Sequence, residues 1–119
     1  MNREIKFRKW AKHTNGEYGM VDWMILSGGT VYQLLDLEDG EVLMQYTNLK
    51  DKNGVEIYEG DIVQFEEPEF ESGVLQCEMV FFDGVFCAKW PNGYIPVWDF
   101  IKDVEVIGNI YENKELTKD

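Results

Sequence analysis

The sequence predicts a mainly β protein with a small SH3-type barrel in its C-terminal half. Aromatic residues make up 14% of the 119 residues, and rings at this density suit strands better than helices. Short apolar segments recur about every ten residues in the second half, separated by turn signals that contain Gly, Asn or Pro. The length fits one domain, or one small barrel with an extra subdomain.

Residues 1–45 are expected to form a smaller part that is β-rich, with α+β as an alternative. Residues 3–10 alternate between apolar and charged side chains, which is the two-residue period of a half-buried strand. The Asn15-Gly16 turn and the apolar residues 18–26 then predict an antiparallel hairpin.

The rest of this part is less uniform. Residues 30–38 fit either a helical turn or extended chain, so their structure type stays open. The Asp39-Gly40 turn signal precedes residues 41–46, which we predict to be a strand.

Residues 46–112 are predicted to form the barrel domain, and residues 113–119 a polar, frayed tail. Closing the sheet into a barrel would remove the exposed edges of so short a sheet. The five predicted barrel strands are residues 61–65, 74–82, 85–90, 94–98 and 104–111.

Several turn and bend residues around the barrel are expected to have structural roles. Asn53-Gly54 is typical of a hairpin turn. Gly60 permits a positive φ where the chain enters the barrel, and Asp61 can accept hydrogen bonds from turn amides. Gly108 lies inside an apolar strand, where a bulge would let the last strand curl.

The charge is strongly negative, with 23 acidic against 11 basic side chains and a net charge of −12. This balance works against general binding to a phosphate backbone. Residues 1–13 carry a net +4, whereas residues 53–88 hold nine acidic side chains and no basic one. A solvated face explains the acidic stretch most simply, and a surface for a basic partner is the alternative. The candidate acidic surface is Glu59, Glu66, Glu67, Glu69 and Glu71.

The cysteine and hydropathy patterns indicate a cytoplasmic protein. Cys77 and Cys87 are expected to be free thiols in a reducing compartment. Two cysteines and the distant His13 do not supply a zinc site, and we predict no metal and no cofactor. The chain has no apolar run of about 18–20 residues, and its N-terminus is too charged for a signal peptide.

Catalytic constellations are not evident in the sequence. Glu59 and Asp61 would share one face of a strand, but nothing near them would separate their pKa values into an acid and a base. We therefore predict that the protein is not an enzyme.

Aromatic side chains on the later barrel strands are the candidate partner-binding set. Such rings either fill a small core, which is the favoured interpretation, or line a groove for an extended peptide. The set consists of Trp90, Tyr94, Trp98 and Phe100.

Four segments in order resemble the YopX-like family of phage and prophage proteins. They are residues 3–8 with Trp10, residues 45–54, residues 56–63 and residues 105–113. One departure is Asn48, where the family usually has Gly; Asn tolerates the left-handed region, so a turn there can survive. The resemblance implies an SH3-type barrel, a small β-rich N-terminal part and an origin in a mobile element of a bacterium. It implies no activity, because this family is one of uncharacterised proteins.

The sequence thus leaves three functional hypotheses. The first is a non-enzymatic module that binds a protein partner, a second copy of itself included. The second is an acidic decoy of nucleic acid, which requires the carboxylates to gather on one face. The third is nucleic-acid binding through the basic N-terminal arm, Arg3, Lys6, Arg8, Lys9 and Lys12, which the net charge disfavours. No membrane partner is expected.

Overall fold

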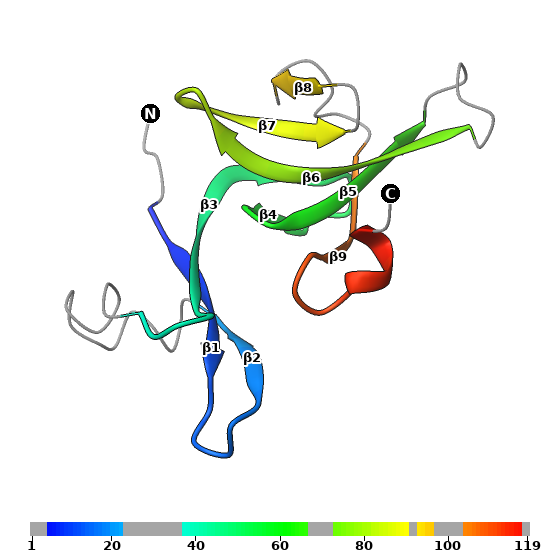
Figure 1. Ribbon diagram of the computed structural model, residues 1–119. Coiled ribbons are helices and arrows are strands. Elements are labelled where there is room, and N and C mark those ends of the chain that lie inside the picture. The colour runs from blue at the N-terminus through cyan, green and yellow to red at the C-terminus, as the bar shows by residue number, and fades with distance from the viewer. Residues whose placement is uncertain (1–4, 23–36, 67–72, 91–92, 97–103, 118–119) are drawn as a thin grey trace. The chain divides into compact units, whose positions relative to one another are not determined.

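The computed structural model describes residues 5–22, 37–66, 73–90, 93–96 and 104–117, and within these ranges the protein is mainly β (Figure 1). The predicted fold class is therefore confirmed. The chain divides into two compact units, Met1–Tyr46 and Thr47–Asp119.

The first unit is built on a hairpin of β1 (Phe7–Lys12) and β2 (Tyr18–Val21). The two strands pair antiparallel, as the Asn15-Gly16 turn predicted, and Lys12 lies opposite Tyr18. Gly16 has a φ of 88° in the connecting turn, a conformation that glycine adopts without a steric penalty.

Strand β3 (Val42–Lys50) pairs antiparallel with β1 and runs four residues beyond the strand end that we predicted at residue 46. That prediction was wrong because Asn48 takes a φ of 70° without ending the strand. The hydroxyl of Thr47 donates to the carbonyl of Ile57, in the short strand β4 (Glu56–Tyr58). The strand order is β2-β1-β3-β4. Of the open segment at residues 30–38, the part up to residue 36 lies outside the described residues.

The second unit contains five strands at the places that the sequence predicted, but the last ends at Asn109 and not at residue 111, because the chain turns there. They pair antiparallel in the order β8-β7-β6-β5-β9. Figure 1 shows β6 curving along its length between β5 and β7, which gives the sheet a barrel-like form. The strands are β5 (Asp61–Glu66), β6 (Val74–Phe82), β7 (Val85–Trp90), β8 (Gly93–Pro96) and β9 (Glu105–Asn109).

The core of this unit lies on one face of the curled sheet. Alternation along β6 and β7 places Met79 opposite Ala88, and both are buried. Phe86 and Trp90 are partly buried and pack against this core. The buried core residues are Ile57, Val63, Leu75, Cys77, Met79, Ala88 and Val104.

The last strand contains a bulge beside Gly108. Ile62 pairs with Gly108 and Val63 pairs with Val106, so Ile107 is an additional residue in β9. The chain then turns, with the backbone amides of Tyr111 and Glu112 donating to the side-chain oxygen of Asn109.

A 3-10 helix, η3 (Lys114–Thr117), follows this turn, in a segment that we expected to be a frayed tail. Asn109 and Asn113 each accept a hydrogen bond from a backbone amide at the start of this segment, and fraying of the tail stays a prediction.

Candidate interaction surface

Aromatic rings surround the tip of the β6–β7 hairpin. Asp83 and Gly84 form its two-residue turn with φ values of 54° and 83°, the left-handed conformations that such hairpins require. Phe81 and Phe82 end β6 immediately before this turn. Three of the surrounding rings are substantially exposed: Phe81 by 54%, Phe82 by 48% and Tyr94 by 43%. We call Phe81, Phe82, Phe86 and Tyr94 the aromatic tip.

Each exposed ring of the tip contacts another ring. Phe82 and Tyr94 are stacked, with centroids 4.1 Å apart and an interplanar angle of 4°. Phe81 meets Phe86 edge to face at 5.0 Å. Because consecutive residues of a strand face opposite sides, one pair lies on each face of the hairpin. The rings are thus exposed and yet held in defined positions.

The predicted aromatic set coincides with this surface only in part. Tyr94 belongs to the aromatic tip, whereas Trp90 packs against the core. Trp98 and Phe100 lie outside the described residues. Phe81 and Phe82 were missed by the sequence reasoning. The signal that could have found them is the Phe-Phe pair directly before Asp83-Gly84, because a two-residue turn fixes the register of both strands.

Cys87 lies on the face of the sheet that carries the Phe82–Tyr94 stack. It pairs with Val80 on one side and Pro96 on the other, two residues from Phe82 and Tyr94 respectively. Its side chain is buried without belonging to the core cluster, and we infer that the stack covers it. Burial raises the pKa of the Cys87 thiol, and the negative charge of Asp83 raises that pKa further.

Cys77 belongs to the core on the other face of the sheet, and both thiols are free. Burial raises the pKa of the Cys77 thiol to about 11. In the hairpin register Cys77 is offset from Cys87, which lies opposite Val80, so the ten-residue spacing does not bring the two thiols together.

The candidate acidic residues have diverse environments. Glu66 is exposed at the end of β5, and Glu59 is half-buried in the turn before Gly60. Glu67, Glu69 and Glu71 lie outside the described residues, so gathering of the acidic set on one face stays a prediction. The half-buried Glu78 lies opposite Lys89; burial raises the pKa of Glu78, and the positive charge of Lys89 opposes that rise.

Asp51 is a buried connector between two distant segments. One carboxylate oxygen accepts the backbone amides of Asn53 and Val55, and the other accepts the amide of Val106 in β9 at 2.9 Å. Burial tends to raise the pKa of Asp51, but these amides and the nearby Lys52 hold it below its ordinary value. Gly54 completes the turn with a φ of 83°.

The entry to β5 has a related arrangement. Gly60 has a φ of 85°, and the buried Asp61 accepts the backbone amide of Tyr58 at 2.8 Å. Asp61 is thus engaged in a turn and does not form an exposed carboxylate pair with Glu59.

The residues just described fall within sequence segments that identify the family. The sequence profile of the YopX protein family matches residues 6–118, which is nearly the whole chain. This chain belongs to the YopX family. The resemblance stated from the four sequence segments is therefore confirmed.

Solved structures resemble this YopX-family chain over almost its full length. The crystal structure of protein EF1440 from Enterococcus faecalis has 26% sequence identity and a TM-score of 0.61, covering 98% of this chain and 100% of the other. The crystal structure of protein YopX from Bacillus subtilis has 22% identity and a TM-score of 0.57, covering 95% and 98%. No curated protein matches the chain in sequence.

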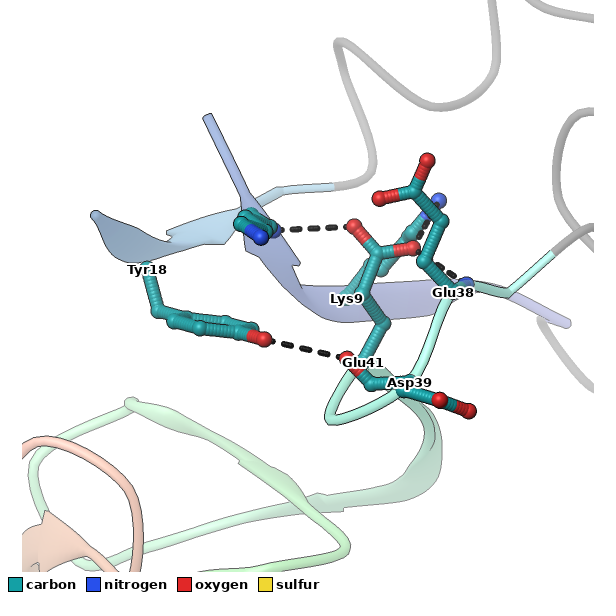
Figure 2. Close-up of polar contacts among 6 residues, drawn as sticks. Lys9, Tyr18, Glu38, Asp39 and Glu41 are labelled. Atoms are coloured by element: carbon teal, nitrogen blue, oxygen red, sulfur yellow. Dashed lines mark hydrogen bonds and ion pairs between the residues drawn. The ribbon is translucent and has the colours of Figure 1, made fainter. Parts of the chain in front are cut away.

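The first unit of this YopX-family protein contains a polar cluster around Glu41 (Figure 2). Its carboxylate accepts the backbone amides of Lys12 and Glu38 and lies 3.6 Å from the amine of Lys9. The two amide hydrogen bonds and the charge of Lys9 lower the pKa of Glu41, although burial opposes them. Figure 2 also shows the hydroxyl of Tyr18 donating to the carbonyl of Asp39.

Contacts within the first unit also engage cations of the basic N-terminal arm. Lys9 pairs with Glu41, and the amine of Lys6 lies 4.8 Å from the ring centroid of Tyr46. Arg3 lies outside the described residues. Nucleic-acid binding through this arm stays a prediction, and the two contacts weigh against it because they compete with phosphates for the same cations.

The described residues hold neither a metal-ligand cluster nor a membrane-spanning helix. The described ranges contain no group of three or more His, Cys, Asp or Glu side chains placed to hold a metal ion. In the same part of the chain, no helix is long and apolar enough to cross a membrane.

Proposed function

We propose that this YopX-family protein is a non-enzymatic protein-interaction module that binds its partner through the aromatic tip. The observation that carries the proposal is that Phe81, Phe82 and Tyr94 are each roughly half exposed while being fixed by ring–ring contacts. Clustered exposed apolar side chains mark interaction surfaces, and aromatic residues are enriched at the centres of interfaces.

The fixed positions of the rings favour binding. Immobilising a flexible side chain at an interface costs about 0.5–1.5 kcal/mol. Because Phe82 and Tyr94 already stack at 4.1 Å, much of this cost is met during folding. The two-residue turn at Asp83 and Gly84 and the regular β6–β7 ladder hold the rings on a defined support.

The roles of the well-placed carboxylates support a non-enzymatic function. Asp51, Asp61 and Glu41 each accept hydrogen bonds from backbone amides, which explains their positions through folding. The pKa values of Asp51 and Glu41 are lowered, so these groups are poorly suited to donate protons near neutral pH. The resemblance to phage and prophage proteins supports action in a bacterial cytoplasm, which forms part of the proposal.

Comparative affinity capture tests the proposed function. The wild-type protein, a Phe81→Ser/Phe82→Ser variant and a Val55→Ser variant would each be used as bait in the bacterium that encodes the protein. Val55 is the matched control, because it is 47% exposed and apolar but lies in the turn before β4, away from the tip in sequence.

We expect one or more partners, or a second copy of the chain, to be enriched by wild type and Val55→Ser and lost from the double variant. Circular dichroism would check that the double variant is folded. Equal capture by all three baits would overturn the assignment to the tip. Capture of nothing, together with a strictly monomeric mass by light scattering, would overturn the interaction module itself.

A further inference from the structure

We infer that the aromatic tip receives an arginine side chain from a short extended segment of a protein partner. The guanidinium stacks on the exposed rings of Phe82 and Tyr94 and pairs with the carboxylate of Asp83. The inference rests on the proposed function and adds the chemical class of the partner.

The rings provide the first part of this recognition. Phe82 and Tyr94 retain 48% and 43% of their surface in contact with solvent, despite their mutual stacking. A cation positioned against an aromatic ring is attracted by the ring quadrupole, by roughly 0.5–1 kcal/mol at exposed sites. A cationic partner therefore gains from the rings in addition to burying their apolar surface.

Asp83 provides the second part. It follows Phe82 directly, is exposed, and is held in the left-handed conformation of a two-residue turn. Its charge raises the pKa of the buried Cys87 thiol, so Asp83 lies within electrostatic reach of β7. A carboxylate thus directly follows Phe82 in the chain, and the ring of Phe82 stacks on that of Tyr94 from β8.

The surrounding charge also selects a cation. Residues 53–88, which include the whole of β6, contain no basic side chain. Lys89 is the next cation along the chain; it lies between Glu78 and Tyr94 on the face of the stack, and the carboxylate of Glu78 offsets its charge. The unit Thr47–Asp119 contains sixteen acidic and six basic residues, a net charge of −10. The charge complement of this surface is therefore a basic segment.

The size of the surface favours a short segment over a second folded copy. A fully buried aromatic side chain covers 150–250 Å², so the exposed parts of Phe81, Phe82 and Tyr94 amount to roughly 300 Å². A stable interface between folded proteins covers about 800 Å² on each partner. Two copies that each carry a net charge of −12 would also repel one another.

Arginine suits the tip better than lysine. The planar guanidinium can stack on a ring and present two donors to a carboxylate at the same time, whereas an ammonium is a compact, strongly hydrated charge. We therefore expect discrimination between the two cations.

A titration followed by NMR tests the inference. The full-length ¹⁵N-labelled protein would be titrated with an acetylated, amidated pentapeptide of sequence Gly-Arg-Ser-Arg-Gly, and with versions in which citrulline or lysine replaces both arginines. We expect the arginine peptide to shift the amides of residues 81–86 and 94. The citrulline peptide should bind about tenfold more weakly, because it loses both the ring–cation attraction and the ion pair.

Variants separate the contribution of the Asp83 carboxylate from that of the rings. Asp83→Asn should weaken arginine-peptide binding roughly two- to fivefold, as expected for an exposed ion pair. Tyr94→Ser should weaken it more strongly, whereas Tyr94→Phe, which keeps the ring, should leave it unchanged. Lysine binding should be weaker than arginine binding and should depend less on Tyr94.

The possible results separate this inference from the proposed function. Equal binding of the arginine and citrulline peptides, or arginine-induced shifts confined to other acidic regions, would overturn the arginine site. Shifts at residues 81–86 caused by zwitterionic phosphatidylcholine vesicles, with none caused by peptide, would overturn it in favour of a membrane. In either case, tip-dependent partner capture would still support an interaction module.

Discussion

The ring of Phe82 lies parallel to the ring of Tyr94, with centroids 4.1 Å apart, although the two residues come from strands separated by β7. The buried thiol of Cys87 lies on β7 on the same face of the sheet. The stack thus joins β6 to β8 across the strand between them. The stack is part of the proposed partner-binding surface, and we expect it to shield the thiol of Cys87.

Cysteine labelling tests whether the stack covers Cys87. We expect Phe82→Ala and Tyr94→Ala each to increase the rate at which a maleimide modifies Cys87 several-fold, because removing either ring opens that face. Phe81→Ala is the matched control, since Phe81 lies on the opposite face with Phe86. Cys77, which has a pKa of about 11 and lies in the core, should stay slow throughout. Faster labelling of Cys77 together with Cys87 would indicate general unfolding and contradict a local cover.

Asp51 should make the second unit sensitive to acid. Its pKa is lower in the folded protein than the ordinary value of 3.8, so its stabilising effect is complete above about pH 4. The effect is lost as the pH falls through the lower pKa of the folded state. Asp51→Asn should reduce the free energy of unfolding at pH 7 by about 2–3 kcal/mol, because an amide group cannot serve as acceptor on both sides. Urea unfolding of wild type and Asp51→Asn at pH 7 and pH 3 measures the effect. If the free energy of unfolding differed between the two pH values by the same amount in both proteins, the role of Asp51 would be refuted.

Glu41 should act in the same direction in the first unit. Hydrogen bonds from Glu38 and Lys12, together with Lys9, lower its pKa, so its contribution is present above about pH 4.5 and lost at lower pH. Glu41→Gln should cost about 1 kcal/mol at pH 7 and should speed amide exchange in the β1–β2 hairpin. Lys9→Met should cost less, because the two amide hydrogen bonds remain. If Lys9→Met lowered the free energy of unfolding more than Glu41→Gln did, this order would be contradicted.

Gly40 should tolerate substitution less well than Gly84. Both have left-handed φ values, 87° and 83°, so alanine should cost about 1 kcal/mol at either position from backbone strain. A Cβ atom at Gly40 would also lie 2.7 Å from the hydroxyl of Tyr18. At Gly84, no atom beyond the adjacent residues would lie within 4 Å of such a Cβ atom. Gly40→Ala should therefore be the more destabilising in thermal unfolding, and Tyr18→Ala should remove the excess. Equal losses at the two glycines would contradict a steric contribution.

Local sequence patterns predicted strand bounds correctly at those hairpins whose turn residues fix the pairing register. The bounds of β6 and β7 follow from Asp83-Gly84, because a two-residue turn leaves one pairing. The predicted end of β3 was wrong because Asn48 takes a φ of 70° within the strand and does not end it. The partner of Asp51 could not be predicted, since Val106 lies 55 residues further along the chain.

The candidate surface was only partly accessible to sequence reasoning for a similar reason. Tyr94 was selected because it lies near other aromatic residues in the chain, and the same criterion selected Trp90, which packs against the core. Phe82 contacts Tyr94 through a strand order and curvature that spacing along the chain does not reveal.

Photo-crosslinking from the aromatic tip tests the proposed interaction most directly. Benzoylphenylalanine would replace Phe82 in one variant and Val55 in another, because both native side chains are apolar and about half exposed. Irradiation in the encoding bacterium should join the protein to a discrete partner from position 82, and the yield from position 55 should be much lower. Equal adduct yields from both positions, or adducts from position 55 alone, would contradict a partner-binding role for the aromatic tip.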